Sequence, residues 1–227
     1  MSEPPRFAEV SHPIEPGMRT YPGLPPPEAI VMLDYDTSRE RYQSEAEFYI
    51  ASLHLCGNTG TYVDAPIHRY RDGIDLADLP LYRLAHLPAV VFRAPGGRDR
   101  AIGPELFDGT DVEGKAVLVH TGWSRYWSTE RYFEPNPYLT GEACELLVSR
   151  GAYFVGIDSL NIDNIEESAR PAHTILLGAG IPVCEHMTNL VSLPDEGSRL
   201  HAVPIAWRGG ASFPVRAYAI LPSAAGN

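Results

Sequence analysis

The stretch from residue 57 to residue 68 reads GNTGTYVDAPIH and gathers side chains that can carry out acid–base chemistry. Asn58, Tyr62, Asp64 and His68 supply an amide, a phenol, a carboxylate and an imidazole, all at even spacing. In an extended chain, side chains at even spacing point to one face. A carboxylate near an imidazole can fix its tautomer and raise its basicity. The same residue types also form ordinary strands and turns, so a catalytic and a purely structural interpretation both stay open here.

A second group of candidate residues lies in PAHTILLGAGIPVCEHMTNL, where His173 and Glu185 are 12 residues apart. Both are metal-ligand types, and a short helix, a turn and a strand between them could bring both to one edge of a sheet. Asp158 and Asp163 follow the apolar run AYFVGID and could either support the site or cap a loop. His186 follows Glu185 directly, so on a strand it should point to the opposite face.

These residues must be positioned by many short elements. Apolar, β-branched runs bounded by Gly and Pro predict strands at EFYIASLHLC, AHLPAVVFRA, GKAVLVHTGW, AYFVGID and IPVCEHM, with LHAVPIAW and FPVRAYAIL as a closing pair. TGEACELLVSRG predicts a helix with Thr140 as N-cap and Gly151 as its stop, and AHTILLGAG predicts a short helix. The 21 prolines include an extended proline-rich arm at about 11–30. Interleaved strands and helices favour a single α/β domain with a mixed sheet.

Composition narrows the function. A chain of 227 residues with 44% hydrophobic residues can bury one sizeable core. The net charge of -11 argues against nucleic acid and against an anionic membrane surface as partners. No apolar run approaches a membrane span, and three scattered cysteines suggest buried thiols in a reducing compartment, so we expect a cytoplasmic protein. The motifs GxGxxG, GxxxxGK[ST], GxSxG and HExxH are absent from the sequence.

The chain resembles the bacterial cyclase family, which includes kynurenine formamidases and isatin hydrolase. The family signature HxGTHxDAPxH is similar to residues 58–68 of this chain, and the later His and Glu of the signature match His173 and Glu185. Other segments are also similar to segments of the family: SHPIEPGMRTYPG, HTGW, VGIDSLNID and VPIAWRGGASFPVRAYAIL. The resemblance therefore covers nearly the whole chain.

The resemblance implies a swivelling β/β/α fold, homodimers or homotetramers, and hydrolysis of an amide or lactam at a zinc or manganese centre. Asn58 and Tyr62 stand where the family has two metal-ligand histidines. Amide oxygen and neutral phenol are poor zinc ligands. We therefore expect one divalent metal, Zn or Mn, held by Asp64, His173 and Glu185, or no metal at all. The resemblance implies that His68 is the general base.

Three functions stay open. The first is hydrolysis of a small cyclic or aryl amide, ester or lactone, with Asn58 completing the site, His68 taking the proton of water and Tyr62 donating a hydrogen bond to the oxyanion. The second is a metal-independent acid–base cyclisation, dehydration or isomerisation by the same residues. The third is a binding protein that has lost its chemistry.

Aromatic residues suggest an aromatic or cyclic small-molecule substrate. The candidates for the pocket lining are Tyr21, Trp123, Tyr126, Trp127 and Tyr132, of which Tyr21 and Trp123 are the predicted substrate-binding pair beside Asn58. His54 precedes the first motif at even spacing and could be a relocated metal ligand. The stretch Pro22–Pro27 looks too extended to pack on its own chain, which favours a homodimer or homotetramer.

Overall fold

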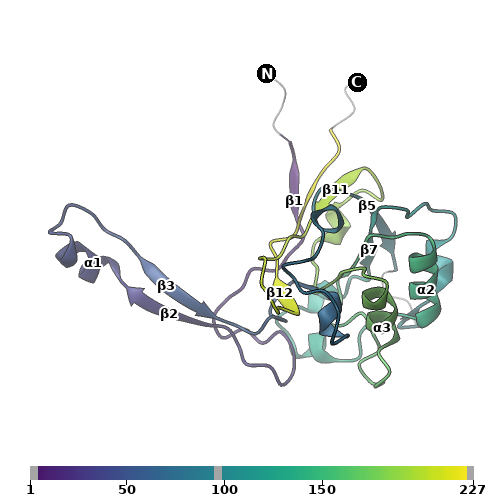
Figure 1. Ribbon diagram of the computed structural model, residues 1–227, viewed down its shortest axis with the longest axis horizontal. Coiled ribbons are helices and arrows are strands. Elements are labelled where there is room, and N and C mark those ends of the chain that lie inside the picture. Colours follow the sequence, from purple (N-terminus) through teal and green to yellow (C-terminus); the bar gives the residue numbers. More distant parts are fainter. Residues whose placement is uncertain (1–4, 95–98, 224–227) are drawn as a thin grey trace.

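A mixed sheet of nine strands organises the computed structural model, which describes residues 5–94 and 99–223 (Figure 1). The strands of this sheet, in spatial order, are β1 (Phe7–Glu9), β13 (Tyr218–Ile220), β11 (Ser198–His201), β5 (Leu87–Arg93), β7 (Ala116–His120), β9 (Phe154–Ile157), β10 (Val183–Glu185), β4 (Tyr62–Asp64) and β12 (Ser212–Pro214). The four central strands β5, β7, β9 and β10 run parallel, and the flanking pairs are antiparallel. The predicted mixed α/β fold is confirmed.

Two smaller sheets and three α-helices complete the described part of the chain. The small sheets pair β2 (Glu28–Leu33) with β3 (Ile50–His54), and β6 (Ala101–Ile102) with β8 (Tyr138–Leu139). The helices are α1 (Tyr35–Arg41), α2 (Gly141–Ser149) and α3 (Pro171–Gly178). None of the described helices is long and apolar enough to cross a membrane.

The large sheet is buried on both faces, as expected for parallel strands. Successive residues of β7 belong to two different core clusters: Val117 and Val119 pack with α2 and α3, whereas Ala116 and Leu118 pack on the other side. This alternation follows from the two-residue period of a strand. Because both faces are covered, the sheet gives the polar side chains at its β10–β4–β12 edge a rigid support.

Several predicted elements are confirmed. Thr140 caps α2 by accepting a hydrogen bond from the backbone N–H of Ala143 at 3.2 Å, and Gly151 follows the helix with φ +74°. The short helix α3 ends at Gly178. The closing pair is only partly right, because β11 pairs with β13 whereas β12 pairs with β4.

The strand predicted from residue 58 onward starts later than expected. Regular β-structure covers only Tyr62–Asp64, because Gly60 adopts φ +63° before it and Pro66 starts a 3-10 helix after it. Gly57 allows a close backbone approach, since an added Cβ there would collide with the carbonyl oxygen of Ser212. The stretch is therefore a turn, a short strand and a helical turn.

The N-terminal region divides into two parts. Residues 28–54 form the β2–β3 hairpin with α1 at its tip, which projects away from the body of the molecule (Figure 1). Residues 11–27 have no strand or helix. This segment contacts the rest of the chain, since Thr20 donates a hydrogen bond to the Asn58 carbonyl at 3.3 Å and Leu24 lines a cavity, but most of the stretch from Pro22 to Pro27 is exposed.

Candidate active site

Three neighbouring strands bring the central side chains together. In the antiparallel register, Tyr62 of β4 lies opposite Glu185 of β10, and Asp64 of β4 lies opposite Ser212 of β12. Directly opposed residues of antiparallel strands project from the same face of a sheet. Tyr62, Glu185, Asp64 and Ser212 therefore share one face, although up to 150 residues separate them in the chain.

Tyr62 and Glu185 form a buried hydrogen-bonded pair. The Tyr62 hydroxyl donates to Glu185 Oε2, and the backbone N–H of Ile162 donates to Glu185 Oε1 at 2.7 Å. Glu185 is 1% exposed, and this burial, helped by the nearby Asp64, raises its pKa to about 7 against the opposing effect of His173. Glu185 can therefore gain or lose a proton near neutral pH.

Asp64 is fully buried and contacts two imidazoles. Its Oδ1 accepts a hydrogen bond from the Ser212 hydroxyl and lies 3.7 Å from His68 Nδ1. Its Oδ2 lies 3.7 Å from His173 Nε2 and has no hydrogen-bond partner in the described parts of the chain. Burial alone would raise the pKa of Asp64, but His68, His173 and Ser212 together outweigh it and lower the pKa. Asp64 is therefore an anion at neutral pH.

His173 is held by Asp163. The residue lies in the first turn of α3, and its Nδ1 is 2.6 Å from Asp163 Oδ2. The same carboxylate accepts the backbone N–H groups of Ala172 at 2.6 Å and of His173 at 3.1 Å, so it also satisfies the start of the helix. The carboxylate accepts a hydrogen bond from the Nδ1–H group and thereby fixes the ring orientation. Asp163 therefore supports the site by holding His173 and also caps the start of α3.

The charge of His173 follows from its surroundings. Burial lowers the pKa of this imidazole, but Glu185, Asp163 and Asp64 outweigh burial and raise the pKa to about 10. His173 Nε2 lies 3.6 Å from Glu185 Oε1. In the absence of other ligands, His173 is therefore an imidazolium at neutral pH that neutralises part of the buried negative charge.

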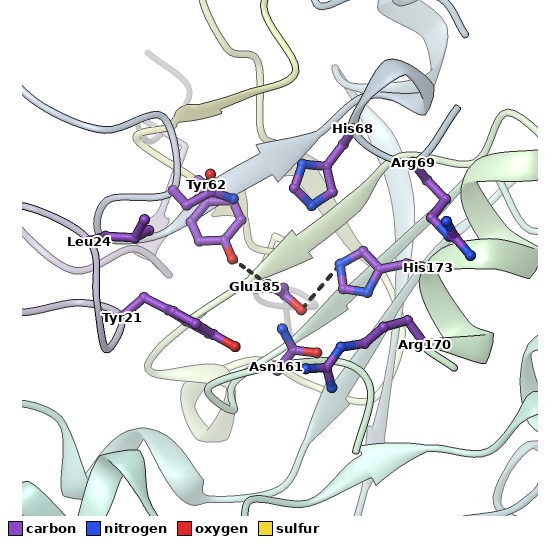
Figure 2. Close-up of a pocket in the computed structure, with 10 residues that line it drawn as sticks. Tyr21, Leu24, Tyr62, His68, Arg69, Asn161, Arg170, His173 and Glu185 are labelled. Atoms are coloured by element: carbon purple, nitrogen blue, oxygen red, sulfur yellow. Dashed lines mark hydrogen bonds and ion pairs between the residues drawn. The ribbon is translucent and has the colours of Figure 1, made fainter. Parts of the chain in front are cut away.

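A cavity of about 290 Å³ opens onto these groups (Figure 2). Its lining comprises Tyr21, Leu24, Asn58, Tyr62, His68, Arg69, Asn161, Arg170, His173 and Glu185. In the close-up, His68, Tyr62 and His173 surround Glu185, whereas Tyr21 closes the opposite side. A volume of this size suits a small molecule of one or two rings.

The possible metal ligands overlap with the predicted set. Among the described residues, one ligand atom from each of Asp64, His68 and His173 lies within 4.8 Å of the others. Glu185 is not part of this group, although its Oε1 lies 3.6 Å from His173 Nε2. The structure thus groups His68, predicted as the base, with two of the three predicted ligands.

The predicted substrate-binding residues separate into two places. Tyr21 and Asn58 line the cavity, as expected. Trp123 does not line this cavity. It lies three residues after the end of β7 and lines a second cavity together with Arg125 and Tyr126. Its indole N–H donates to the Tyr132 carbonyl at 3.1 Å. The expectation that Trp123 binds substrate beside Tyr21 is therefore not supported by its position.

Other aromatic and histidine candidates lie outside the cavity. Tyr132 is fully buried, with its hydroxyl 3.1 Å from His186 Nδ1, and Trp127 stacks on the His12 ring. His186 follows the last residue of β10, adopts φ 56° and does not line the cavity. His54 is exposed at the end of β3 in the projecting hairpin and does not join the group of possible metal ligands.

Five residues of the site were missed by the sequence analysis: Leu24, Arg69, Asn161, Arg170 and Ser212. Arg69 follows His68 directly, and Arg170 lies three residues before His173, so their positions beside predicted catalytic residues were a usable signal. Ser212 gave no signal, because it meets Asp64 only through the pairing of β12 with β4.

Comparisons with known proteins place the chain in a family. The family model described as "Putative cyclase" matches residues 8–164. Kynurenine formamidase of Salinibacter ruber is 28% identical over 212 residues, which cover 92% of this chain and 94% of that protein. Isatin hydrolase A from Labrenzia aggregata, solved with benzyl benzoate, superimposes with a TM-score of 0.84 at 23% identity, covering 96% of this chain and 94% of that one.

A further solved structure, described as a potential metal-dependent hydrolase with cyclase activity, superimposes with a TM-score of 0.75 at 23% identity and covers 94% of this chain and 96% of that one. These likenesses confirm the fold predicted from the resemblance, and the hydrolase prediction agrees with the names of the relatives. Since the family model spans well over half of the sequence, the chain belongs to the cyclase family.

Proposed function

We propose that this protein hydrolyses the C–N bond of a small aryl amide or of a related cyclic amide, with ester or lactone bonds as close chemical relatives. The observation that carries the proposal is the position of His68 and His173 at the wall of a small cavity, each beside the buried carboxylate of Asp64. The relatives named kynurenine formamidase and isatin hydrolase support an amide or lactam as the substrate class.

His68 is the proposed general base. The Ser212 hydroxyl uses its proton to donate to Asp64, so its oxygen is free to accept from His68 Nδ1 at 3.2 Å. A neutral imidazole that donates from Nδ1 has its acceptor lone pair on Nε2. This tautomer can take a proton from a water molecule in the cavity, and Asp64 stabilises the positive charge that develops on the ring.

Charge that develops on the attacked carbonyl oxygen needs a donor. His173, protonated at neutral pH and lining the cavity, supplies a positive charge that water reaches poorly, since the residue is 6% exposed. The prediction assigned this role to Tyr62, but the Tyr62 hydroxyl donates to Glu185. We assign Tyr62 instead to controlling the proton of Glu185.

Glu185 is the proposed acid for the leaving nitrogen. An aryl amine leaves more readily when its nitrogen is protonated in the transition state. A carboxyl group with a pKa of about 7 holds a proton in a large fraction of molecules at neutral pH and releases it easily. Its position in the cavity wall beside His173 lets one substrate amide contact both groups.

The residues present fit one divalent metal ion. Asp64, His68 and His173 offer one carboxylate and two imidazoles, which are zinc and manganese ligands, and Asp64 Oδ2 is a buried oxygen without a hydrogen-bond partner. A bound metal would polarise the substrate carbonyl and lower the pKa of water, and it would take over these tasks from His173 and His68, whose ring nitrogens would then be its ligands. The name of one solved relative, a potential metal-dependent hydrolase, supports a metal.

A metal-independent acid–base reaction, such as a cyclisation or dehydration, is the second candidate function. The observation that favours it is the distance of His173 Nε2 from two carboxylates, 3.7 Å to Asp64 and 3.6 Å to Glu185. An imidazolium between two carboxylates already neutralises charge that a metal would otherwise balance. Both candidates use the same residues but differ in whether water is consumed.

Formate or amine release from simple aryl formamides, and ring opening of isatin-type lactams, test the proposal. Asp64→Asn and His68→Ala should each abolish turnover, because one removes the buried anion and the other the base. His54→Ala is the matched control, since His54 is an exposed histidine on the hairpin. Full activity of His68→Ala, or no hydrolysis of any amide, lactam or ester tested, would refute the proposed function.

A further inference from the structure

Two arginines border the cavity without a carboxylate partner. Arg69 follows His68, and Arg170 precedes the first residue of α3. Within residues 5–94 and 99–223, neither guanidinium has a carboxylate oxygen within 4.0 Å. Seven other arginines do have one: Arg19, Arg39, Arg93, Arg100, Arg150, Arg208 and Arg216. The charges of Arg69 and Arg170 are therefore available to a ligand, in a protein whose net charge is -11.

Hydrogen bonds hold both side chains at the same edge of α3. Arg69 Nε donates to the Thr174 hydroxyl at 3.0 Å, and that hydroxyl donates to the Arg170 carbonyl at 2.8 Å. One terminal nitrogen of Arg170 donates to the Asn164 carbonyl. Each guanidinium thus uses part of its donors for anchoring and keeps others for a ligand. Figure 2 shows the two arginines on either side of His173.

The backbone of Arg170 is also unusual. It adopts φ 51° and ψ 56°, a left-handed conformation that costs a non-glycine residue of order 1–2 kcal/mol. Glycine or asparagine would occupy this position more easily, and neither carries a positive charge. An arginine in a strained conformation beside His173 indicates that its side chain contributes more than packing.

We propose that Arg69 and Arg170 select substrates that carry a carboxylate next to the scissile amide. The inference rests on the proposed hydrolysis and names its substrate class: aryl amides of one or two rings with an ortho carboxylate. Arg69 and Arg170 line the same cavity of about 290 Å³ as the proposed base His68 and as His173. A cavity of this volume leaves room for only a small ring system, so a carboxylate that reaches the arginines must stand near the scissile amide on that ring.

The same positive charges disfavour other amides. A substrate with an ammonium group would bring a cation beside two arginines. A neutral aryl amide would leave the guanidinium donors facing the cavity without a partner. Arginine forms a bidentate, charge-assisted pair with a carboxylate, so the anionic substrate gains the most from this wall of the cavity.

The experiment compares two probes of the same shape, ortho-formamidobenzoate and ortho-formamidobenzamide, which differ in charge. For wild-type protein, kcat/KM for the formamide bond of ortho-formamidobenzoate should be at least about tenfold higher than for that of ortho-formamidobenzamide, as expected for a charge-assisted pair. Arg170→Gln and Arg69→Gln should each reduce this ratio toward one, chiefly through KM. Arg170→Lys should retain part of it. Arg125→Gln, which changes a cation of the second cavity, is the matched control and should keep the full ratio.

Binding of ortho-aminobenzoate and ortho-aminobenzamide, followed by fluorescence, gives a readout that needs no turnover. Tighter binding of the anion, lost in Arg170→Gln, supports the inference even if no formamide is hydrolysed, in which case the proposed function alone fails. Equal rates and equal binding for the two charge forms overturn the inference while leaving hydrolysis intact. An anion preference that persists in both arginine variants also overturns it, because the carboxylate then binds elsewhere.

Discussion

Removal of one hydroxyl group from Tyr62 should change the pH dependence of catalysis. In the structure this hydroxyl donates to Glu185 Oε2 and stabilises the ionised carboxylate. A hydrogen bond to a charged group contributes about 1.5–3 kcal/mol, and one pKa unit corresponds to about 1.4 kcal/mol. Tyr62→Phe should therefore raise the pKa of Glu185 by about one to two units from its present value of about 7.

If Glu185 protonates the leaving nitrogen, its loss of a proton ends activity at alkaline pH. The alkaline limb of the kcat/KM profile of an aryl formamide should then move upward by the same one to two units in Tyr62→Phe. Titration of the Glu185 carboxyl by NMR with carbon-13-labelled glutamate measures the pKa shift independently of turnover. The matched control is Tyr132→Phe, which also removes a fully buried hydroxyl but one whose partner is His186.

Tyr132→Phe should lower the free energy of unfolding by about 1 kcal/mol, the contribution of a neutral hydrogen bond, and leave the pH profile in place. A uniform fall of about 100-fold at every pH in Tyr62→Phe would refute the reasoning, because that is the signature of a donor to the oxyanion. Full activity with an unmoved profile would remove Tyr62 from the mechanism altogether.

Four further outcomes are expected. Elemental analysis of protein purified without chelators should give no more than one divalent ion per chain, absent from Asp64→Asn; two ions would contradict the ligand grouping. Asp163→Asn should lower turnover about 10–100-fold by freeing the His173 ring, with little change in the secondary structure measured by circular dichroism. Burial lowers the pKa of His186 to about 3, so the unfolded chain is protonated first as the pH falls below 6.5. The contribution of His186 to stability should be complete above pH 6.5 and lower by about 2 kcal/mol at pH 5, so the stability lost between these pH values in denaturant titrations should be about 2 kcal/mol smaller in the His186→Gln variant. We propose that the exposed apolar hairpin packs in a homodimer or homotetramer, because an isolated two-stranded sheet is marginally stable in water; sedimentation should show a species larger than 24.9 kDa that Val31→Asp with Leu53→Asp dissociates.

The elements with strong local signals could be predicted from the sequence. The N-cap of Thr140, the stop at Gly151 and the apolar β-branched central strands all depend on neighbours within a few residues. The β4 strand was predicted to start too early, since even spacing was read as extended structure across Gly60. Side-chain parity holds only while the backbone stays extended, and here a left-handed glycine and a proline interrupt it on both sides.

The candidate site was predictable where one segment supplied the residues and unpredictable where strand pairing supplied them. Asp64 and His68 came from one stretch, and His173 from a second with its own helix signal. The contact of Ser212 with Asp64 depends on the pairing of β12 with β4, and the partner of the Tyr62 hydroxyl depends on the register of β4 against β10. Register between distant strands is fixed by the packing of the whole sheet, which a short motif does not encode.

Charge balance connects the altered motif with the arginines at the cavity wall. Three buried carboxylates, Asp64, Asp163 and Glu185, lie around one imidazolium, His173, and the raised pKa of Glu185 lets a proton balance part of the remaining charge. Had the arginines been needed to compensate Asp64 or Glu185, they would lie within ion-pair distance of a carboxylate, as seven other arginines of the described chain do. Arg69 and Arg170 carry positive charges that form no ion pair with an internal carboxylate, as expected of residues that bind an anionic substrate. Replacing both arginines by glutamine should therefore change substrate selection more than it changes the free energy of unfolding.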